Sequence, residues 1–410
     1  MSAHGVVVAG NGQAGFQAAV SLRKEGYQGP VVLVGEEPGL PYQRPPLTKE
    51  YMTGNGGAET VRLRPEPFYE KQGIELVAGE RVERVERGER RAELSSGRAL
   101  GYEHLVLALG SRPRALRVPG ADLDGVHLLR TLADAELLRA RLAGAREVVV
   151  VGGGFIGLEL AAAAAKRGAG VTVVEALDRT MARVVSPEMS HHFTGLHEAA
   201  GTTVLLRTGV EAIEGTGGRV TGLELSDGSS LPADLVVVGV GVVPNTAPAE
   251  QAGLEIDDGV VVDELLATSD PAISAIGDCA AYPSRHAGAR VRLESVQNAT
   301  DHGRCVAARI SGRPEPYTSV PWFWTDQHGR KLQIAGLTPA AEETVVRGDP
   351  GEGAFSVLCF RGGRLTGVES VNRMADHMAA RRLLAAACEL TPEQAAHPDF
   401  DLKAHAAQAA

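Results

Sequence analysis

Cysteine is scarce in this 410-residue sequence, and its four copies are scattered. Cys279, Cys305, Cys359 and Cys388 form no C-x-x-C pair, which argues against a disulfide framework, a zinc site or a protein-borne iron–sulfur cluster. No metal site is therefore expected. The thiols are expected to stay reduced, as they do in cytoplasmic proteins.

Positive charge is also in short supply, because 41 Lys and Arg against 51 Asp and Glu give a formal net charge of −10. Without a long basic block, nucleic acid is not an expected partner. No uncharged apolar stretch reaches membrane-spanning length, and the N-terminus lacks a signal-peptide layout. The sequence therefore predicts a soluble, cytoplasmic protein without a membrane partner. Its length suggests two or three domains.

The stretch from residue 5 to residue 37 contains a complete dinucleotide-binding pattern. An apolar run is followed by Gly10-Asn11-Gly12-Gln13-Ala14-Gly15, a helical segment, a second apolar run and Glu36. In such a unit the first glycine makes the turn, the second lets the backbone approach a pyrophosphate, and the third lets the helix pack closely. The helix N-terminus attracts the phosphates, and Glu36 is placed to bind a ribose hydroxyl.

The pattern returns between residues 148 and 175. An apolar strand precedes Gly152-Gly153-Gly154-Phe155-Ile156-Gly157, an Ala-rich helix follows, and a further strand ends at Glu175. Two composite motifs predict two dinucleotides, and the natural redox pair is a flavin with a nicotinamide. Glu175 favours NADH over NADPH because a carboxylate repels a 2′-phosphate, although Arg179 and Arg183 could weaken this preference.

Between and after these motifs the pattern is mostly of strands. Residues 41–49 are expected to form a rigid extended loop carrying Arg44 and Lys49.

Asp278, directly after a short strand, is either a sugar-hydroxyl acceptor or a helix N-cap. The following segment, 294–309, is expected to be helical. The two tryptophans at 322 and 324 are placed in a loop, either as core or beside a flavin, before an antiparallel sheet and a closing helix.

At this point the chain resembles the FAD-dependent NADH:ferredoxin reductase family of oxygenase electron-transfer systems. The resemblance runs from Val6 to the C-terminal region, and its most specific pieces are PPLTK at 45–49, GGGFIGLE at 152–159, GDCA at 277–280, ESVQNA at 294–299 and PWFWTDQ at 321–327. It implies an α/β fold with two Rossmann-like dinucleotide-binding domains, for FAD and NAD as in glutathione reductase, plus an α+β C-terminal domain. The expected boundaries are 1–111 with 246–321 for FAD, 112–245 for NAD and 322–410 for the C-terminal interface domain.

The resemblance also implies site residues. Besides Gly10, Gly12 and Gly15, the residues expected to contact FAD are Ala14, Glu36, Arg44, Lys49, Val82, Arg130, Asp278 and Val296. Those expected to bind NADH are Gly152, Gly154, Ile156, Gly157, Glu159, Glu175 and Gly241. Lys49 and Glu159 resemble an ion pair beside the reactive flavin edge, and Trp324 is assigned to the same catalytic region.

The expected reaction passes hydride from NADH to the flavin, with Lys49 stabilising the negative charge and Glu159 orienting Lys49. Electrons then go one at a time to a 2Fe–2S ferredoxin that serves a P450 or Rieske oxygenase. Because such ferredoxins and this chain are both acidic, docking needs a local basic patch, for which Arg304 and Arg309 are the candidates. A monomer or weak dimer suffices for this chemistry.

Two departures from the family pattern bear on function. The strand before Gly110 ends Ala108-Leu109, where relatives often have Ala-Thr, so a hydroxyl contact is absent there. No cysteine pair lies at 38–49, which makes disulfide substrates improbable and argues against thiol-dependent oxidases. Rubredoxin reductase and NADH oxidase-like flavoproteins remain alternative functions. A flavoprotein that mainly binds partners, like apoptosis-inducing factor, is the alternative of another class.

Overall fold

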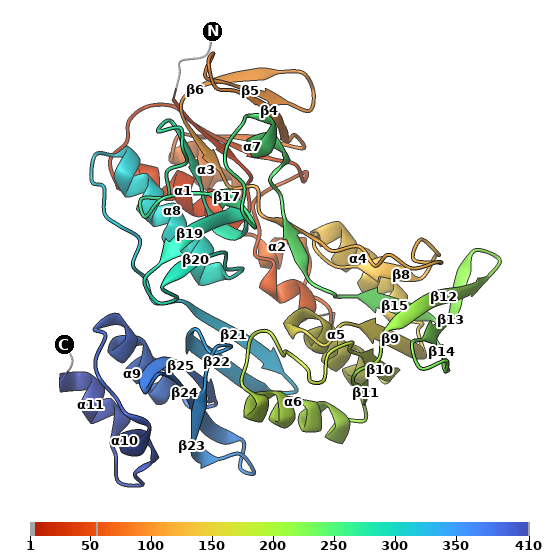
Figure 1. Cartoon of the computed structure of the whole chain (residues 1–410). Helices are drawn as coiled ribbons and strands as arrows, with labels where there is room; N and C mark the ends of the chain where they lie inside the picture. The colour runs from red at the N-terminus through yellow and green to blue at the C-terminus, as the bar shows by residue number, and fades with distance from the viewer. Residues whose placement is uncertain (1–4, 55, 409–410) are drawn as a thin grey trace. The chain divides into compact units, whose positions relative to one another are not determined.

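The computed structural model describes residues 5–54 and 56–408, and its contacts divide the chain into two compact units (Figure 1). Each unit has a hydrophobic core of its own. Unit 1 comprises Met1–Gln43, Ala58–Arg112 and Val243–Ser319; unit 2 comprises Arg44–Gly57, Pro113–Val242 and Val320–Ala410. The chain passes between the units five times, and two of these crossings fall within short strands, β7 (Ser111–Pro113) and β16 (Val242–Pro244).

Unit 1 is built on a seven-stranded sheet whose order is β3-β2-β1-β6-β5-β4, with β18 paired to β6. The central pairs are parallel, and β4, β5 and β6 are joined antiparallel. All five residues of the first strand are buried, as expected for a strand covered on both faces. The strands are β1 (Gly5–Ala9), β2 (Val31–Gly35), β3 (Ile74–Ala78), β4 (Val82–Glu86), β5 (Arg91–Leu94), β6 (Ala99–Leu107) and β18 (Ile273–Ala275).

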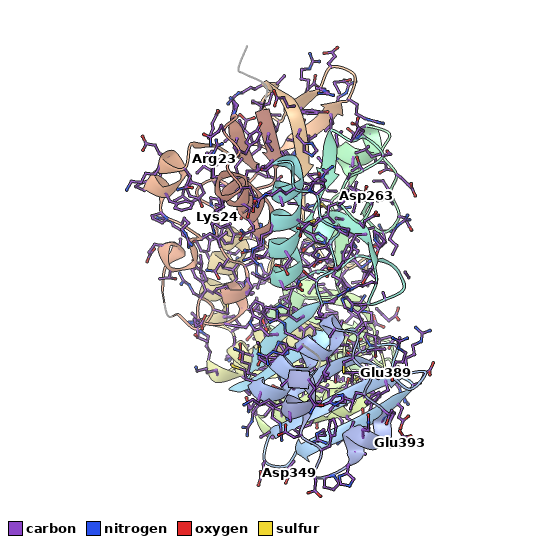
Figure 2. The ribbon with its side chains drawn as sticks, turned by 90° about the vertical axis from the view of Figure 1, so that its left-hand side faces the viewer. Arg23, Lys24, Asp263, Asp349, Glu389 and Glu393 are labelled. Carbon is purple, nitrogen blue, oxygen red and sulfur yellow. The ribbon has the colours of Figure 1, made fainter. Side chains whose placement is uncertain are left out.

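Helices α1 (Gln13–Lys24) and α8 (Val296–Ile310) pack against each other in unit 1 (Figure 1). Their close approach depends on Gly303, because a Cβ there would lie 2.8 Å from the backbone nitrogen of Ala18. Arg23 and Lys24 (Figure 2) occupy the last turn of α1, where positive charge complements the helix dipole. The remaining elements are α2 (Ala58–Val61), α3 (Glu66–Lys71), α7 (Ala247–Gln251), η2 (Gly277–Cys279) and the sheet of β17 (Val260–Val261), β19 (Ala280–Ser284) and β20 (Ala289–Val291).

Unit 2 contains a second parallel sheet, in the order β11-β10-β9-β15-β8. Its strands are β8 (Val126–Leu128), β9 (Glu147–Val151), β10 (Gly170–Val174), β11 (Thr203–Leu205) and β15 (Leu235–Val238). An antiparallel sheet of β12 (Val210–Thr216), β13 (Arg219–Leu225) and β14 (Ser230–Pro232) accompanies it. The helices are η1 (Pro45–Thr48), α4 (Leu132–Leu142), α5 (Phe155–Lys166) and α6 (Pro187–Ala199).

The C-terminal part of unit 2 is a five-stranded antiparallel sheet, ordered β21-β22-β25-β24-β23. Helix α9 (Met374–Ala385) packs on β22 and β25, and α11 (Leu402–Gln408) packs on α9. The other bounds are β21 (Trp322–Gln327), β22 (Arg330–Gly336), β23 (Glu343–Asp349), β24 (Ala354–Arg361), β25 (Arg364–Val371) and α10 (Pro392–Ala396). Two Rossmann-like sheets and a sheet-rich C-terminal part confirm the predicted fold class, whereas the three-domain boundaries stay a prediction.

Two local predictions were wrong. The expected extended loop at 41–49 contains the 3-10 turn η1, because the fixed φ of Pro45 and Pro46 suits the first positions of a helical turn, where no N–H is needed. The expected loop around the tryptophans is strand β21, paired along its whole length with β22. The N-cap alternative for Asp278 is also excluded, since the N-cap of η2 is Ile276.

His302 in α8 generates a prediction about acid stability. It is fully buried, and its Nδ1 accepts a hydrogen bond from the Gly277 backbone N–H at 3.1 Å. Burial lowers the pKa of His302 from 6.5 to about 3, so it stays neutral in the folded protein while the unfolded chain takes up a proton. Its contribution to stability is therefore complete above pH 6.5 and is lost as the pH falls toward 3, by about 1.4 kcal/mol per pH unit.

We expect His302→Asn to flatten this part of the pH dependence, because the Asn carbonyl replaces the acceptor without titrating. Urea unfolding of both proteins at pH 7.5 and pH 5 measures it. Equal losses of unfolding free energy in the two proteins would contradict the assignment.

Candidate active site

The first glycine loop, in unit 1, has the geometry of a phosphate cradle. Gly10 has φ +116°, and a Cβ there would lie 2.1 Å from the carbonyl oxygen of Ala108. At Gly15 a Cβ would lie 1.8 Å from the oxygen of Gly10, so helix and loop touch. A Cβ at Gly12 would have no atom within 4 Å. Gly12 is also the N-cap of α1, and it has no side chain that could accept hydrogen bonds from the free N–H groups of the helix. The open backbone fits an anionic pyrophosphate.

The second loop, in unit 2, repeats each of these features. Gly152 has φ +108°, and a Cβ there would lie 2.5 Å from the oxygen of Gly239. Gly157 touches Gly152, since its Cβ would lie 2.1 Å from that oxygen, while Gly154 again faces open space. Ile156, in the first turn of α5, is 43% exposed. Both loops therefore fit a dinucleotide.

The acids that follow the two loops behave differently. Glu36 is 68% exposed and pairs with Arg81 at 3.2 Å, so it lies at the surface beside the first loop. Glu175 is partly buried, and its two oxygens accept hydrogen bonds from the backbone N–H groups of Gly153 (2.7 Å) and Leu177 (2.8 Å). The Glu175 carboxylate thus fixes the second glycine loop, a role that the sequence did not indicate.

The arginines after Glu175 are candidate partners of a 2′-phosphate. The Arg179 guanidinium instead donates to the carbonyl oxygens of Val185 (2.8 Å) and Ala182 (2.7 Å) and to the Ser190 hydroxyl (2.7 Å). Arg179 is therefore occupied within its own loop. Arg183 is exposed and lies near Gly241, where a Cβ would be 3.2 Å from its Nη2.

The other residues of unit 1 predicted to contact FAD lie on several of its elements. Asp278 accepts a hydrogen bond from the Ser111 hydroxyl at 2.8 Å. Ala14 lies in α1 against Gly277, where a Cβ would approach its methyl group to 2.9 Å. Val82 is 5% exposed at the start of β4, whereas Val296 is partly exposed at the start of α8.

An ion pair in unit 2 joins Lys49 to Glu159. The Lys49 Nζ lies 2.7 Å from Oε2 of Glu159, and the two side chains are 18% and 6% exposed. The hydroxyl of Thr48 donates to the same oxygen at 2.5 Å, and that of Thr325 donates to Oε1 at 2.6 Å. The predicted pair is thus formed within this unit, and the two threonines were missed because each lies far in sequence from Glu159.

Three further predicted residues lie in unit 2. Arg44 donates from Nη1 to the carbonyl oxygen of Arg130 at 2.5 Å, which holds these two FAD candidates together. Trp324 is partly exposed on β21, with its ring 5.5 Å from that of Trp322 at 34°.

The two docking candidates on α8 differ. Arg304 is 63% exposed and forms an ion pair with Asp301 at 3.0 Å. Arg309 instead turns inward, where its Nη2 donates to the Ser274 hydroxyl and lies 3.2 Å from Nε2 of His104. Burial lowers the pKa of Arg309. This geometry does not favour a docking role for Arg309, because its Nη2 is bound inside unit 1.

Other chemistry has little support in the described part of the chain. No group of three or more His, Cys, Asp or Glu suited to a metal ion is found among residues 5–54 and 56–408. Within those same ranges, no helix is long and apolar enough to cross a membrane. The four cysteines are free, and burial raises the pKa of the Cys279 thiol to about 11, which keeps it unreactive.

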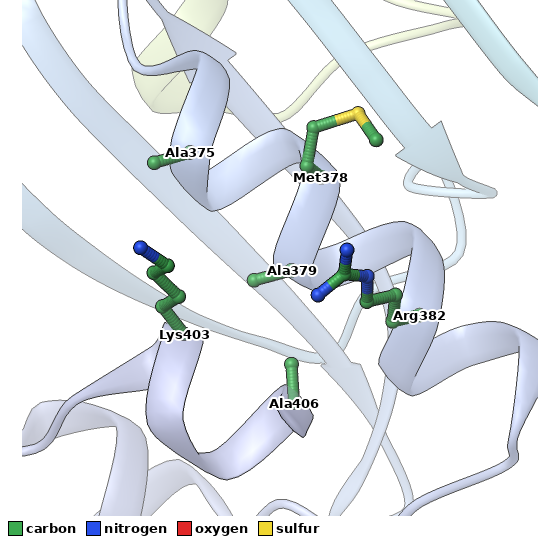
Figure 3. Close-up of a pocket in the computed structure, with 6 residues that line it drawn as sticks. All are labelled: Ala375, Met378, Ala379, Arg382, Lys403 and Ala406. Carbon is green, nitrogen blue, oxygen red and sulfur yellow. The ribbon is translucent and has the colours of Figure 1, made fainter. Parts of the chain in front are cut away.

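A small pocket lies between α9 and α11 (Figure 3). Its lining is drawn only from these two helices, and it includes Met378, Arg382 and Lys403. None of the residues predicted to bind a nucleotide lines it. The exposed carboxylates Asp349 and Glu393 also lie in the C-terminal part of unit 2 (Figure 2).

Comparison with known proteins identifies the family. Residues 4–303 match the model of the pyridine nucleotide-disulphide oxidoreductase family, and residues 322–406 match the reductase C-terminal family. The chain belongs to the pyridine nucleotide-disulphide oxidoreductase family. This confirms the reductase resemblance carried by the sequence motifs.

Similar proteins span the whole chain. Rhodocoxin reductase of Rhodococcus erythropolis is 53% identical over 398 residues, covering 97% of this chain and 93% of its own length. The ferredoxin reductase for the CYP199A2 system from Rhodopseudomonas palustris has a TM-score of 0.96 at 50% identity, with 98% of this chain and 100% of that chain covered. The covalent putidaredoxin reductase–putidaredoxin complex gives a TM-score of 0.96 at 37% identity, covering 100% and 99%.

The glycine geometry predicts opposite outcomes for two alanine substitutions in the second loop. Gly157→Ala forces a Cβ against the Gly152 carbonyl, so we expect a loss of roughly 2–3 kcal/mol of unfolding free energy. Gly154→Ala meets no protein atom, so stability should hold while the affinity for pyridine nucleotide falls at least tenfold. Thermal unfolding and nucleotide titration measure both. Unchanged nucleotide affinity in the folded Gly154→Ala protein would contradict the cradle.

Proposed function

We propose that this chain is an FAD-containing NADH:ferredoxin oxidoreductase, which passes electrons from NADH to a ferredoxin. The observation that carries the proposal is the pair of glycine cradles together with the Lys49–Glu159 ion pair, in a chain that matches reductases over 97–98% of its length. A binding flavoprotein would need nucleotide cradles as well, but the near relatives named above are all reductases.

The residues present fit the two cofactors. Gly10, Gly12 and Gly15 would hold the FAD pyrophosphate, and Asp278, fixed by Ser111, would accept a sugar-alcohol hydroxyl. Arg44, Lys49 and Arg130 in unit 2 belong to the same predicted FAD set. When bound, FAD supplies the conversion between two-electron chemistry with a nicotinamide and one-electron chemistry with a metal cluster.

The chain itself contributes a fixed positive charge. The Lys49 ammonium is held at one place by Glu159, which is in turn held by the hydroxyls of Thr48 and Thr325. A preorganised cation of this kind stabilises negative charge that develops beside it without further reorganisation. Low exposure strengthens the effect, because little water screens the charge.

The second cradle supports NADH as the electron donor. Glu175 presents a carboxylate next to Gly153, and a carboxylate there repels the extra phosphate of NADPH. Arg179 does not offset this charge, because its guanidinium is occupied by Val185 and Ser190. We therefore infer a preference for NADH.

The partner we propose is a 2Fe–2S ferredoxin, which would in turn serve a P450 or Rieske oxygenase. Putidaredoxin is bound to its reductase in the complex that this chain matches over its full length. Because the chain is acidic overall, an acidic ferredoxin needs a local positive contact, and Arg304 is the exposed candidate on α8. A monomer or weak dimer is sufficient for this role.

The function is tested by mixing the purified holoprotein anaerobically with NADH and following the flavin absorbance. We expect fast bleaching by NADH, weaker bleaching by NADPH, and recovery when oxidised 2Fe–2S ferredoxin is added. Omitting the ferredoxin is the control. Bleaching without recovery would exclude this partner and direct the search to rubredoxin, and no bleaching would favour the binding-protein alternative.

Docking is tested by Arg304→Glu, which should raise the apparent KM for ferredoxin at least fivefold because it places a negative charge before an acidic partner. Reduction of a small dye acceptor by NADH should stay nearly unchanged. Arg84→Glu is a matched control, since Arg84 is also 63% exposed and paired with a carboxylate, Glu86 at 2.6 Å. An equal rise of KM in both variants, or a parallel loss of dye reduction, would show that Arg304 is not a docking contact.

A further inference from the structure

The Glu159 carboxylate, in α5, is held by groups from two other parts of unit 2. The residue is buried. Its Oε2 accepts from Lys49 and Thr48 in and beside η1, and its Oε1 accepts from the Thr325 hydroxyl in β21 at 2.6 Å. Thr325 has no exposed surface, so its hydroxyl does not form hydrogen bonds with solvent water. Both oxygens of the carboxylate are therefore fixed by the protein.

A line of buried polar groups continues behind Thr325. The Gln327 side-chain nitrogen donates to the Thr325 hydroxyl oxygen at 3.2 Å. The Gln327 carbonyl oxygen lies 2.9 Å from Nε2 of His197 in α6, and Nδ1 of His197 lies 3.1 Å from Nε2 of His328. Gln327 and His197 are 1% and 0% exposed. We call these four residues, Thr325, Gln327, His197 and His328, the donor chain.

Hydrogen-bond chemistry gives the donor chain a single direction. An ionised carboxylate only accepts, so the Thr325 proton points to Glu159 and its oxygen accepts from the Gln327 amide. The amide oxygen then faces His197, which must carry its proton on Nε2 and accept on Nδ1. Burial lowers the pKa of His197 to about 4, which keeps the ring neutral as this arrangement requires. Each donor polarises the next toward Glu159.

The donor chain is suited to orienting a group and not to moving a proton. An amide such as Gln327 has no proton that it gains and loses in this pH range, so it interrupts a relay. Gln327 does fix the rotation of the Thr325 hydroxyl, because its amide nitrogen already donates to the hydroxyl oxygen. The hydroxyl proton is then donated to Glu159.

The register of β21 places this hydroxyl. Alternate residues of a strand share one face, so Phe323, Thr325 and Gln327 point the same way. The ring of Phe323 stacks on that of Phe155 in α5 with centroids 4.5 Å apart, and Thr325 reaches Glu159 on the same helix. If the register of β21 shifted by one residue, the carboxylate of Asp326 would lie against that of Glu159, and the two negative charges would repel each other.

We propose that Thr325, backed by Gln327 and His197, is a positioning residue that fixes the Glu159 carboxylate and through it the Lys49 ammonium. The proposal rests on the proposed function, because it assigns Lys49 the fixed charge used when NADH is oxidised. The C-terminal part of unit 2 thus takes part in building the site, and not only in binding a partner.

The first test compares Thr325→Val with two other variants. Valine keeps the shape and removes the hydroxyl, so the rate of flavin reduction by NADH should fall about five- to tenfold with little change of KM. Thr325→Ser restores the donor and should stay within about twofold of the original protein. Thr344→Val is the matched control, because the Thr344 hydroxyl donates to another carboxylate, Glu188, at 2.6 Å.

The second test measures the reactivity of the Lys49 amine, and it needs no enzymatic turnover. Acylation of Lys49 by an amine reagent, followed by peptide mass mapping, should be about three- to fivefold faster in Thr325→Val, because the lysine loses its fixed counter-ion. Thr325→Ser and Thr344→Val should react like the original protein. Since labelling needs no NADH, it tests the positioning role even if the proposed reaction fails. Equal labelling of Lys49 in Thr325→Val and Thr344→Val, or equal loss of rate and stability in both, would overturn the proposal.

Discussion

The ion pair between Lys49 and Glu159 is the interaction on which the chemistry proposed for unit 2 depends. Removing a carboxylate from water costs several kcal/mol, and this cost is offset only when the geometry is good and the remaining lone pairs are hydrogen-bonded. Here an ammonium and two hydroxyls meet that condition. Because η1, α5 and β21 must all be in place for these contacts, the fixed charge exists only when these three elements are folded together.

The nucleotide loops could be predicted because their chemistry is local in sequence. A tight turn at Gly10 or Gly152, an open backbone at Gly12 or Gly154 and a close helix all lie within six residues, so the spacing alone identifies them. The strands carried by apolar runs, such as β9, were predicted for the same reason. The Lys49–Glu159 pair came from family resemblance, since nothing in the spacing of two residues so distant in sequence brings them together.

Contacts between distant segments could not be predicted. Thr48 and Thr325 are ordinary threonines in the sequence, and their roles arise only because η1 and β21 both meet α5. Arg309 is a different case, because the sequence did hold the signal. Five residues along an α-helix turn through about 500°, so Arg304 and Arg309 point about 140° apart and do not share one patch. The structure accordingly leaves one exposed and turns the other toward His104.

Strand β21 also explains why a short aromatic stretch was hard to interpret. Its odd-numbered residues face α5, where Phe323 stacks on Phe155 and Thr325 meets Glu159. Its even-numbered residues carry the tryptophans on the opposite face, and the Trp322 ring is covered by the Arg381 guanidinium of α9 at 5.0 Å. Because side chains alternate between the two faces of a strand, β21 contacts α5 with one set of residues and carries the tryptophans on the other face. Because β21 carries Thr325 on one face and Trp324 on the other, the positions of these two side chains are coupled, and the proposed site requires the register of β21 as much as the sheet does.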